Sequence, residues 1–290
     1  MKIAPSEMIL NDDGSIYHLN LKPGEVAEKI ITVGDPGRVE KVAKYMSHFH
    51  VKRQKREFYS ITGEIEGIPI TVISTGIGSD NIDIVFNEID ALFNVDFDTK
   101  LVKDQITPLT FFRLGTSGGM QADIPVDSFI ASEYGVGLEG LVHYYDFQAI
   151  GPAQELEQLI RDSIKDGLPK VYPYAAATDP KLISQFPDQF IQGITLTMGG
   201  FYGPQGRKLR ISLQHDKFLD TLQSLNWNGK RMTNFEMETG AIYAMSQLLG
   251  HRALSLNVIL ANRAKGTFSK DPAQGVENLI KSALPYICDV

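Results

Sequence analysis

The sequence predicts an α/β fold in which a single domain, residues 1–290, forms a central mixed, twisted sheet flanked by helices. Three observations predict it. Short apolar runs typical of buried strands alternate with segments whose apolar residues recur at helical spacing. Several of these runs end in glycine, and no repeat or long low-complexity linker interrupts the pattern. Such alternation is typical of a parallel or mixed sheet with helices on both faces.

The first half of the chain supplies about half of the expected elements. Expected strands are the apolar runs over 29–34, 61–76, 109–115 and 127–135. The run over 61–76 reads as two strands joined at a turn formed by Gly67, Ile68 and Pro69. Expected helices cover 39–46, with Pro36 at a first helical position, and about 81–93.

The second half continues the same alternation. Expected helices cover 153–166, 238–249 and about 271–287, and expected strands lie near 194–199 and over 253–262. The least regular stretch of the middle is 95–108, which we interpret as a possible surface insertion. Because ligands of such sheets bind at the carboxyl ends of strands, the glycine-bearing strand ends are the places to search for function.

Composition excludes several classes of function. The 28 basic and 35 acidic residues give a formal charge of −7, which argues against a general affinity for nucleic acid or an anionic membrane. No apolar run is long enough to span a membrane, and the N-terminal residues lack a signal-peptide pattern. The one cysteine, Cys288, cannot form an intrachain disulfide or a cysteine-based metal site. We therefore expect a cytoplasmic protein.

Two of the strand ends carry arginine. In the first, Gly34 permits close backbone approach, the following helix start offers free amides to an anion, and Arg38 adds a charged fork. A capped helix with a solvent-facing arginine is the alternative. In the second, Arg113 lies inside an apolar strand and precedes residues 115–119, which we expect to be a loop rich in amides and hydroxyls. Buried arginine requires an anion or a carboxylate, so either a ligand or a core acid is expected there.

The other two strand ends are polar. Residues 234–240 open a helix, and their carboxylates, Glu236 and Glu238, either favour the helix N-terminus or grip the hydroxyls of a sugar. Asn262 and Arg263 follow the most apolar strand, where a polar residue can simply end the strand.

Other patterns do not indicate a cofactor or a metal. Residues 76–81 begin like a dinucleotide fingerprint, but Asn81 stands where the third glycine belongs. His48 and His50 share a strand face without further metal ligands, so no metal site is predicted.

Taken together, the segments GDPGR (34–38), STGIG (74–78), RLGTSGG (113–119) and NFEMET (234–239) resemble, in the right order, the signatures of the nucleoside phosphorylase superfamily. The resemblance runs from about His18 to the last helix and implies the phosphorylase/hydrolase-like fold. Residues 201–207, FYGPQGR, resemble the pyrimidine-recognition segment of uridine phosphorylases within that purine and uridine phosphorylase family. Purine-specific members usually carry an Asp shortly after the last strand, where this chain has Asn262, Arg263 and Ala264.

The resemblance implies a role for each matching residue. Phosphate would be held by Gly34, Arg38, Arg113 and Thr116, with Arg56 reaching across from a neighbouring subunit. Ribose would be held by Met237 and Glu238, with His18 from the partner chain. The base would be held by Gly118, Phe201, Gln205, Arg207 and Arg263. Arg113, Glu238, Arg207 and Gln205 would be the catalytic residues.

The resemblance further implies a homo-oligomer with sites shared between subunits, acting on a nucleoside and inorganic phosphate without a required cofactor. A monovalent cation at a dimer interface stays open, because Glu57 is retained but Asn81 replaces a small hydroxyl residue. The implied reaction is reversible phosphorolysis of uridine to uracil and ribose 1-phosphate. The alternatives are a purine nucleoside phosphorylase, a hydrolytic nucleosidase on the same fold, and a non-catalytic nucleoside-binding module.

Overall fold

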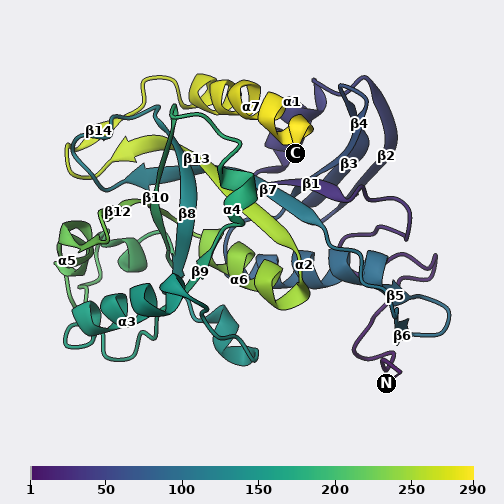
Figure 1. Ribbon diagram of the computed structural model, residues 1–290, viewed down its shortest axis with the longest axis horizontal. Coiled ribbons are helices and arrows are strands. Elements are labelled where there is room, and N and C mark those ends of the chain that lie inside the picture. Colours follow the sequence, from purple (N-terminus) through teal and green to yellow (C-terminus); the bar gives the residue numbers. More distant parts are fainter. Residues whose placement is uncertain (1) are drawn as a thin grey trace.

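The computed structural model describes residues 2–290 and confirms an α/β fold built on one mixed sheet (Figure 1). The strand order is β11-β12-β10-β8-β13-β7-β1-β4-β3-β2, with β9 paired to β8 and β14 to β13. Four neighbouring strands, β4 (Ile68–Ser74), β1 (Lys29–Val33), β7 (Thr110–Gly119) and β13 (Arg252–Asn262), run parallel. Their carboxyl ends therefore meet at one edge of the sheet, as expected.

One half of the sheet closes on itself. Beyond β13 lie β8 (Phe129–Gly137), β10 (Phe190–Thr197) and β12 (Lys230–Glu236). The last of these pairs back onto β7, with Phe235 opposite Gly118 and Asn234 opposite Gly119. Five strands thus form a ring, and this closure brings the carboxyl end of β12 beside that of β7.

The other half is an open antiparallel extension. It contains β3 (Phe58–Ile65) and β2 (His48–Lys55), and shorter strands complete the sheet elsewhere: β9 (Tyr174–Ala177), β11 (Asn226–Trp227) and β14 (Thr267–Phe268).

Helices cover both faces of the sheet (Figure 1). On one face α1 (Pro36–Ala43), α4 (Pro180–Ile183) and α7 (Pro272–Asp289) share an apolar core with β3, β4, β7 and β13. On the other, α2 (Ser79–Asn94) packs on α6 (Thr239–Leu249) over a second core. A third core lies under α3 (Pro152–Ile164) and α5 (Phe218–Ser224). Two 3₁₀ turns cover Leu141–Tyr144 and Gly203–Gln205.

Two local predictions were wrong. The turn between β3 and β4 is formed by Glu66 and Gly67, both at positive φ, whereas Ile68 and Pro69 lie inside β4. Residues 115–119 are not a loop but the continuation of β7, because β13 pairs with this stretch through Gly119. Small, glycine-rich residues had suggested a turn there, yet their small size serves close packing inside the sheet.

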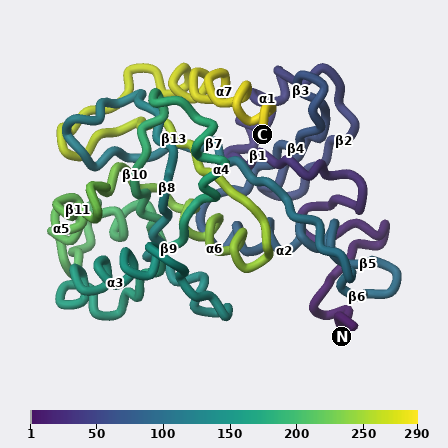
Figure 2. The backbone as a smooth tube through the Cα atoms, in the orientation of Figure 1, coloured from purple at the N-terminus to yellow at the C-terminus, as the bar shows by residue number. Residues whose placement is uncertain are grey.

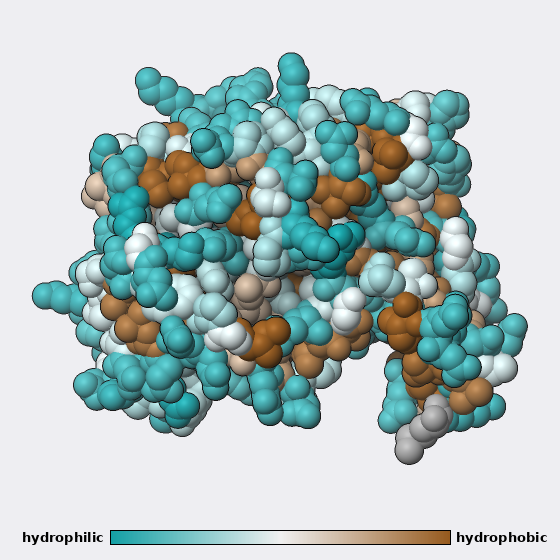
Figure 3. Space-filling view, viewed as in Figure 1, coloured by the Kyte–Doolittle hydropathy of each residue, from teal (hydrophilic) through white to brown (hydrophobic). Residues whose placement is uncertain are grey.

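The stretch 95–108 lies on the surface and forms a lobe beside the N-terminal segment (Figure 2). It contains the short strands β5 (Val95–Asp96) and β6 (Leu101–Val102), and Lys2 forms a β-bridge with Leu101. Leu101 and Val102 are exposed, and Figure 3 shows apolar surface on this lobe. That the stretch is an insertion stays a prediction.

Candidate active site

A cavity of about 820 Å³ opens at the carboxyl edge of the sheet. All four strand ends singled out in the sequence contribute to its walls. The predicted site residues that line it are Gly34, Arg38, Arg113, Thr116, Gly118, Phe201, Gln205, Arg207, Met237 and Glu238. A volume of this size is typical of a small-molecule site.

One end of the cavity combines a helix start with an arginine. The Asp35 side chain caps α1 by accepting from the Gly37 amide at 3.0 Å, and Pro36 occupies the first turn. Arg38 follows on the same turn and donates from Nη1 to the Leu114 carbonyl at 3.0 Å. Burial, and then the neighbouring Arg113, lower the pKa of Arg38 to about 10, which leaves it protonated at neutral pH. An anion arriving here would relieve the repulsion between the two arginines.

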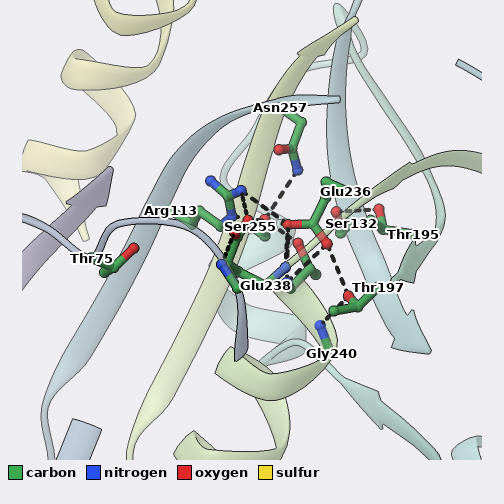
Figure 4. A network of polar contacts seen from close by, with 12 residues as sticks. Thr75, Arg113, Ser132, Thr195, Thr197, Glu236, Glu238, Gly240, Ser255 and Asn257 are labelled. Atoms are coloured by element: carbon green, nitrogen blue, oxygen red, sulfur yellow. Dashed lines mark hydrogen bonds and ion pairs between the residues drawn. The ribbon is translucent and has the colours of Figure 1, made fainter. Parts of the chain in front are cut away.

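Arg113 lies at the centre of a buried ionic cluster (Figure 4). Its Nε donates to Glu236 Oε2 at 3.1 Å, and its Nη2 contacts both Glu236 and Glu238. The pairing explains how an arginine is tolerated inside an apolar strand, because each charge compensates another. The sequence left open whether Arg113 meets a ligand or a core acid. The two acids that pair with it, Glu236 and Glu238, also line the cavity.

Gly115 makes room for this arrangement. A Cβ atom at that position would collide with the Arg113 guanidinium and with Asn257 Oδ1. The guanidinium therefore folds over the strand that carries it. Gly118 has a similar role, since a Cβ there would stand 2.8 Å from the Phe235 ring that pairs opposite.

Glu236 organises the start of α6. Its Oε1 accepts from the Thr197 hydroxyl at 2.9 Å, and both oxygens accept from the Thr239 amide. Its Oε2 also accepts from the Glu238 amide at 2.9 Å. All of its acceptor capacity is committed, so its contribution is to fix Arg113 and the helix start rather than to grip a sugar.

Glu238 faces the cavity. Its Oε1 accepts from the Gly78 amide at 2.7 Å, at the N-terminus of α2, while Oε2 meets Arg113. Burial, followed by the nearby Glu236, raises its pKa, although Arg113 opposes the shift. A buried carboxylate with a raised pKa in a cavity is a candidate functional group.

The opposite end of the cavity is the turn 201–207. Gln205 is buried there, and its side-chain oxygen accepts from Arg207 Nη1, which also donates to the Phe201 carbonyl at 2.6 Å. The Arg207 guanidinium lies 3.8 Å from the centre of the half-exposed Phe201 ring. Burial, and then Arg263, lower the pKa of Arg207.

Three predicted residues do not line the cavity. Arg263 lies behind the turn and donates to the carbonyl oxygens of Gln205 and Gly206, which supports the turn from outside. Arg56 is exposed at the turn between β2 and β3. His18 is held by Glu88 of α2, whose Oε1 lies 2.6 Å from its Nδ1. Neither Arg56 nor His18 reaches this cavity within one chain.

Several lining residues are not among those that the sequence singles out. Phe268 of β14 stands exposed at the rim, and Ile77 and Leu260 add apolar wall. Their only local signals are an apolar strand end and an aromatic after Gly266, which many surface hairpins share. Glu57 and Asn81, on which a monovalent cation would depend, also line the cavity.

Residues 2–290 contain no cluster of three or more His, Cys, Asp or Glu side chains arranged to hold a metal ion. In the same range, no helix combines the length and apolarity needed to cross a bilayer.

Comparison with known proteins assigns the family. A model of the phosphorylase superfamily matches residues 28–284, which includes every wall of the cavity. The chain belongs to the phosphorylase superfamily. A crystal structure of a Trypanosoma brucei nucleoside phosphorylase, described as showing uridine phosphorylase activity, superposes on this superfamily member with a TM-score of 0.88. The sequences are 29% identical, and the match covers 98% of this chain and 100% of that one.

The relatives include proteins named for both classes of base. A uridine phosphorylase of Thermococcus kodakarensis is 28% identical over 272 residues, which cover 93% of this chain and 85% of that protein. A guanosine phosphorylase of Halorubrum lacusprofundi is 25% identical over 269 residues, covering 90% of this chain and 92% of that protein. The family therefore establishes the fold and the class of reaction, and the base must be argued from the site.

Proposed function

We propose that this superfamily member is a uridine phosphorylase, which reversibly converts uridine and phosphate to uracil and ribose 1-phosphate in pyrimidine salvage. One observation carries the proposal. A single cavity holds two arginines beside a helix start at one end, the buried Gln205 with the partly buried Arg207 at the other, and Glu238 beside Arg113. These are the three chemical environments that phosphate, a pyrimidine and a ribose need.

Phosphate binds at the α1 end. Gly34 allows the anion to approach the backbone, Arg38 and Arg113 supply charge, and Thr116 supplies a hydroxyl. Arg56 of a neighbouring subunit completes the anion site. Burial, and then the proximity of Arg113, lower the pKa of Arg38, and the closeness of these two cations supports this assignment because adjacent cations favour an anion between them.

Ribose binds in the middle of the cavity. The Glu238 carboxylate accepts from its hydroxyls, Met237 packs against the ring, and His18 of the neighbouring subunit reaches the sugar. The position of Glu238 between Arg113 and the α2 N-terminus supports this role, since both groups hold the carboxylate in place.

Uracil binds against the turn 201–207. Its polar edge is read by Gln205 and Arg207, Phe201 packs on its face, Gly118 borders it and Arg263 holds the turn from behind. Gln205 is buried, so an unmatched base would leave its amide without a partner. That penalty supplies selectivity for a pyrimidine edge.

Catalysis follows from charge. As the glycosidic bond breaks, positive charge grows on the ribose and negative charge on the leaving uracil. The phosphate, aligned by Arg38 and Arg113 against the anomeric carbon, stabilises the first and attacks it, and Gln205 with Arg207 stabilises the second. Prearranged groups of this kind contribute about 10²–10³ in rate for one good donor.

Several expectations extend from this mechanism. The active form is a homo-oligomer, a dimer or an assembly of dimers, because the family resemblance assigns Arg56 and His18 to a site that they do not reach within their own chain. Phosphate is a co-substrate, no metal or organic cofactor is required, and the enzyme works in the cytoplasm. Residues 1–290 act as one domain, with 95–108 as a surface insertion.

The purine alternative is disfavoured at one position. Asn262 is buried, and its amide nitrogen donates to the carbonyl oxygens of Gln121 and Ile124 at 2.8 and 2.7 Å. It therefore holds neighbouring loops rather than facing a base. The arginines Arg38 and Arg113 argue against a hydrolase, because hydrolysis needs no bound phosphate. The presence of separate environments for phosphate, ribose and base in one cavity argues against a module that only binds a nucleoside.

The test is base release from uridine, thymidine, inosine and adenosine, each with and without phosphate. Uracil from uridine only with phosphate supports the proposal. Base release without phosphate would indicate a hydrolase, turnover of the purine nucleosides alone would indicate a purine phosphorylase, and no turnover would favour a binding module.

A further inference from the structure

A second cavity of about 750 Å³ lies on the other side of the turn 201–207. Tyr202, Gly203 and Pro204 line this cavity, whereas Phe201 and Gln205 line the first. The turn is therefore a partition between two spaces of similar size. Nothing in the proposed reaction uses the second one.

The second cavity has apolar walls from several elements. Leu138 and Met198 follow β8 and β10, Leu168 and Val171 follow α3, and Phe218 begins α5. The segment 207–215 closes the remaining side. The volume falls within the range of small-molecule sites. Such sites are lined mostly by apolar side chains, and a few polar groups orient the ligand.

The segment 207–215 contacts the chain at Gly167. A Cβ atom at residue 167 would collide with Cδ2 of the His215 ring, so a larger residue there would push this ring aside. Leu209 of the same segment lines the cavity yet is 77% exposed. The segment thus presents apolar side chains beside an apolar space.

The charges of the lining favour an anion. Arg207 and Arg210 line the cavity, although the chain as a whole has a formal charge of −7. Glu139 is the acid among the lining residues, and its two oxygens accept from the Tyr174 hydroxyl and the Leu141 amide. A carboxylate engaged on both oxygens competes weakly for the arginines.

Arg207 is common to both cavities. Its Nη1 is engaged by Gln205 and the Phe201 carbonyl, while Nε and Nη2 have no hydrogen-bond acceptor among residues 2–290. A guanidinium with free donors at a shared wall can bind an anion on either side. An anion bound to these free donors in the second cavity would draw the Arg207 guanidinium away from the first cavity, where the proposed function places it on the base.

We propose that the second cavity binds a small apolar anion, an aromatic or aliphatic carboxylate or sulfonate, and that its binding weakens nucleoside binding through Arg207. Because coupling of two binding sites is reciprocal, the nucleoside must weaken the anion by the same factor. The proposal that the cavity binds an anion is independent of the proposed function. The proposal that this anion weakens nucleoside binding rests on the proposed function.

The probe is 8-anilinonaphthalene-1-sulfonate, an apolar anion whose fluorescence rises at apolar sites. The wild-type protein should bind it saturably, and Val171→Trp, which places a large ring in the cavity, should weaken binding about tenfold or more. The control is Ile150→Trp, at an exposed position that lines neither cavity, and it should bind as the wild type does. Equal dye binding by Val171→Trp and the wild type would overturn the proposal, as would a lack of saturable binding.

A second pair of variants avoids the risk of misfolding. Leu209 is exposed, so Leu209→Asp and Leu209→Asn should both fold, and they differ only in charge. The aspartate variant should bind the dye about threefold more weakly than the asparagine variant at low salt. Identical affinities would contradict an anion at this wall.

Coupling is measured by the KM for uridine at saturating dye. We expect KM to rise in the wild type and in Ile150→Trp but not in Val171→Trp, with the KM for phosphate unchanged. If saturating dye leaves the KM for uridine unchanged in the wild type, the proposed coupling through Arg207 is overturned. If uridine is not a substrate at all, the proposed function fails while the dye titrations still decide the site.

Discussion

Replacing Arg113 with alanine removes one cation from between two buried carboxylates. In the wild type, Arg113 pairs with both Glu236 and Glu238, and all three side chains are almost inaccessible to solvent. Without the guanidinium, the two acids would face each other in a cluster whose remaining donors are backbone amides and the Thr197 hydroxyl. The change should therefore affect both stability and activity.

The cost follows from the uncompensated charge. Breaking a buried ion pair by removing one partner costs about 3–5 kcal/mol, a large part of the about 5–15 kcal/mol that stabilises a typical domain. Burial already raises the pKa of Glu238, and loss of Arg113 should raise it further. A folded-state pKa above the unfolded value means that stability is lost as pH rises through the folded pKa. The deficit of Arg113→Ala relative to the wild type should thus be larger at about pH 8 than at about pH 5.

The assay is urea unfolding at both pH values, together with phosphorolysis of uridine. The double variant Arg113→Ala/Glu238→Gln removes one uncompensated charge and should recover part of the stability lost in Arg113→Ala. Both variants should be much less active than the wild type, since both lack an anion-binding arginine. The loss of one such group lowers the rate about 10²–10³-fold. An Arg113→Ala protein as stable and active as the wild type would refute the reasoning about the cluster.

The remaining predictions concern the two ends of the cavity and its completion by a second subunit. Gln205→Ala should lower kcat/KM for uridine about tenfold or more and leave the KM for phosphate unchanged, and equal uridine kinetics would contradict the base assignment. Arg38→Ala should raise the KM for phosphate about tenfold or more, with partial recovery in Arg38→Lys, because lysine keeps the charge but not the fork. Arg56→Ala and Arg113→Ala should each be inactive, yet hetero-oligomers refolded from a mixture of both should regain activity, since some sites would then combine two intact arginines. No recovery in verified hetero-oligomers would argue against sites shared between subunits.

The parts of the site that the sequence predicts are those with a local signal. Gly34 and Arg38 follow an apolar run directly, and Arg113 is conspicuous as a charge inside a strand. These features depend on neighbouring residues alone, so strand ends and their chemistry could be located without the fold. The pairing of Arg113 with a core acid was also expected as one alternative, and the structure shows two such acids, Glu236 and Glu238.

The features that the sequence does not predict depend on distant pairing. The pairing of β7 with β12 places Gly118 opposite Phe235, more than a hundred positions away in the sequence. Neither segment carries a local pattern that predicts this pairing. For the same reason residues 115–119 were interpreted as a loop, because the strand pairing that orders them comes from β13. Phe268 reaches the rim only through the β13–β14 hairpin. The second cavity escapes prediction because its walls come from several separate elements.

The most direct test of uridine phosphorolysis is the stoichiometry of products from uridine and inorganic phosphate. We predict uracil and ribose 1-phosphate in equal amounts, no uracil without phosphate, and uridine re-formed when the two products are mixed. Uracil released together with free ribose, or at the same rate without phosphate, would contradict it.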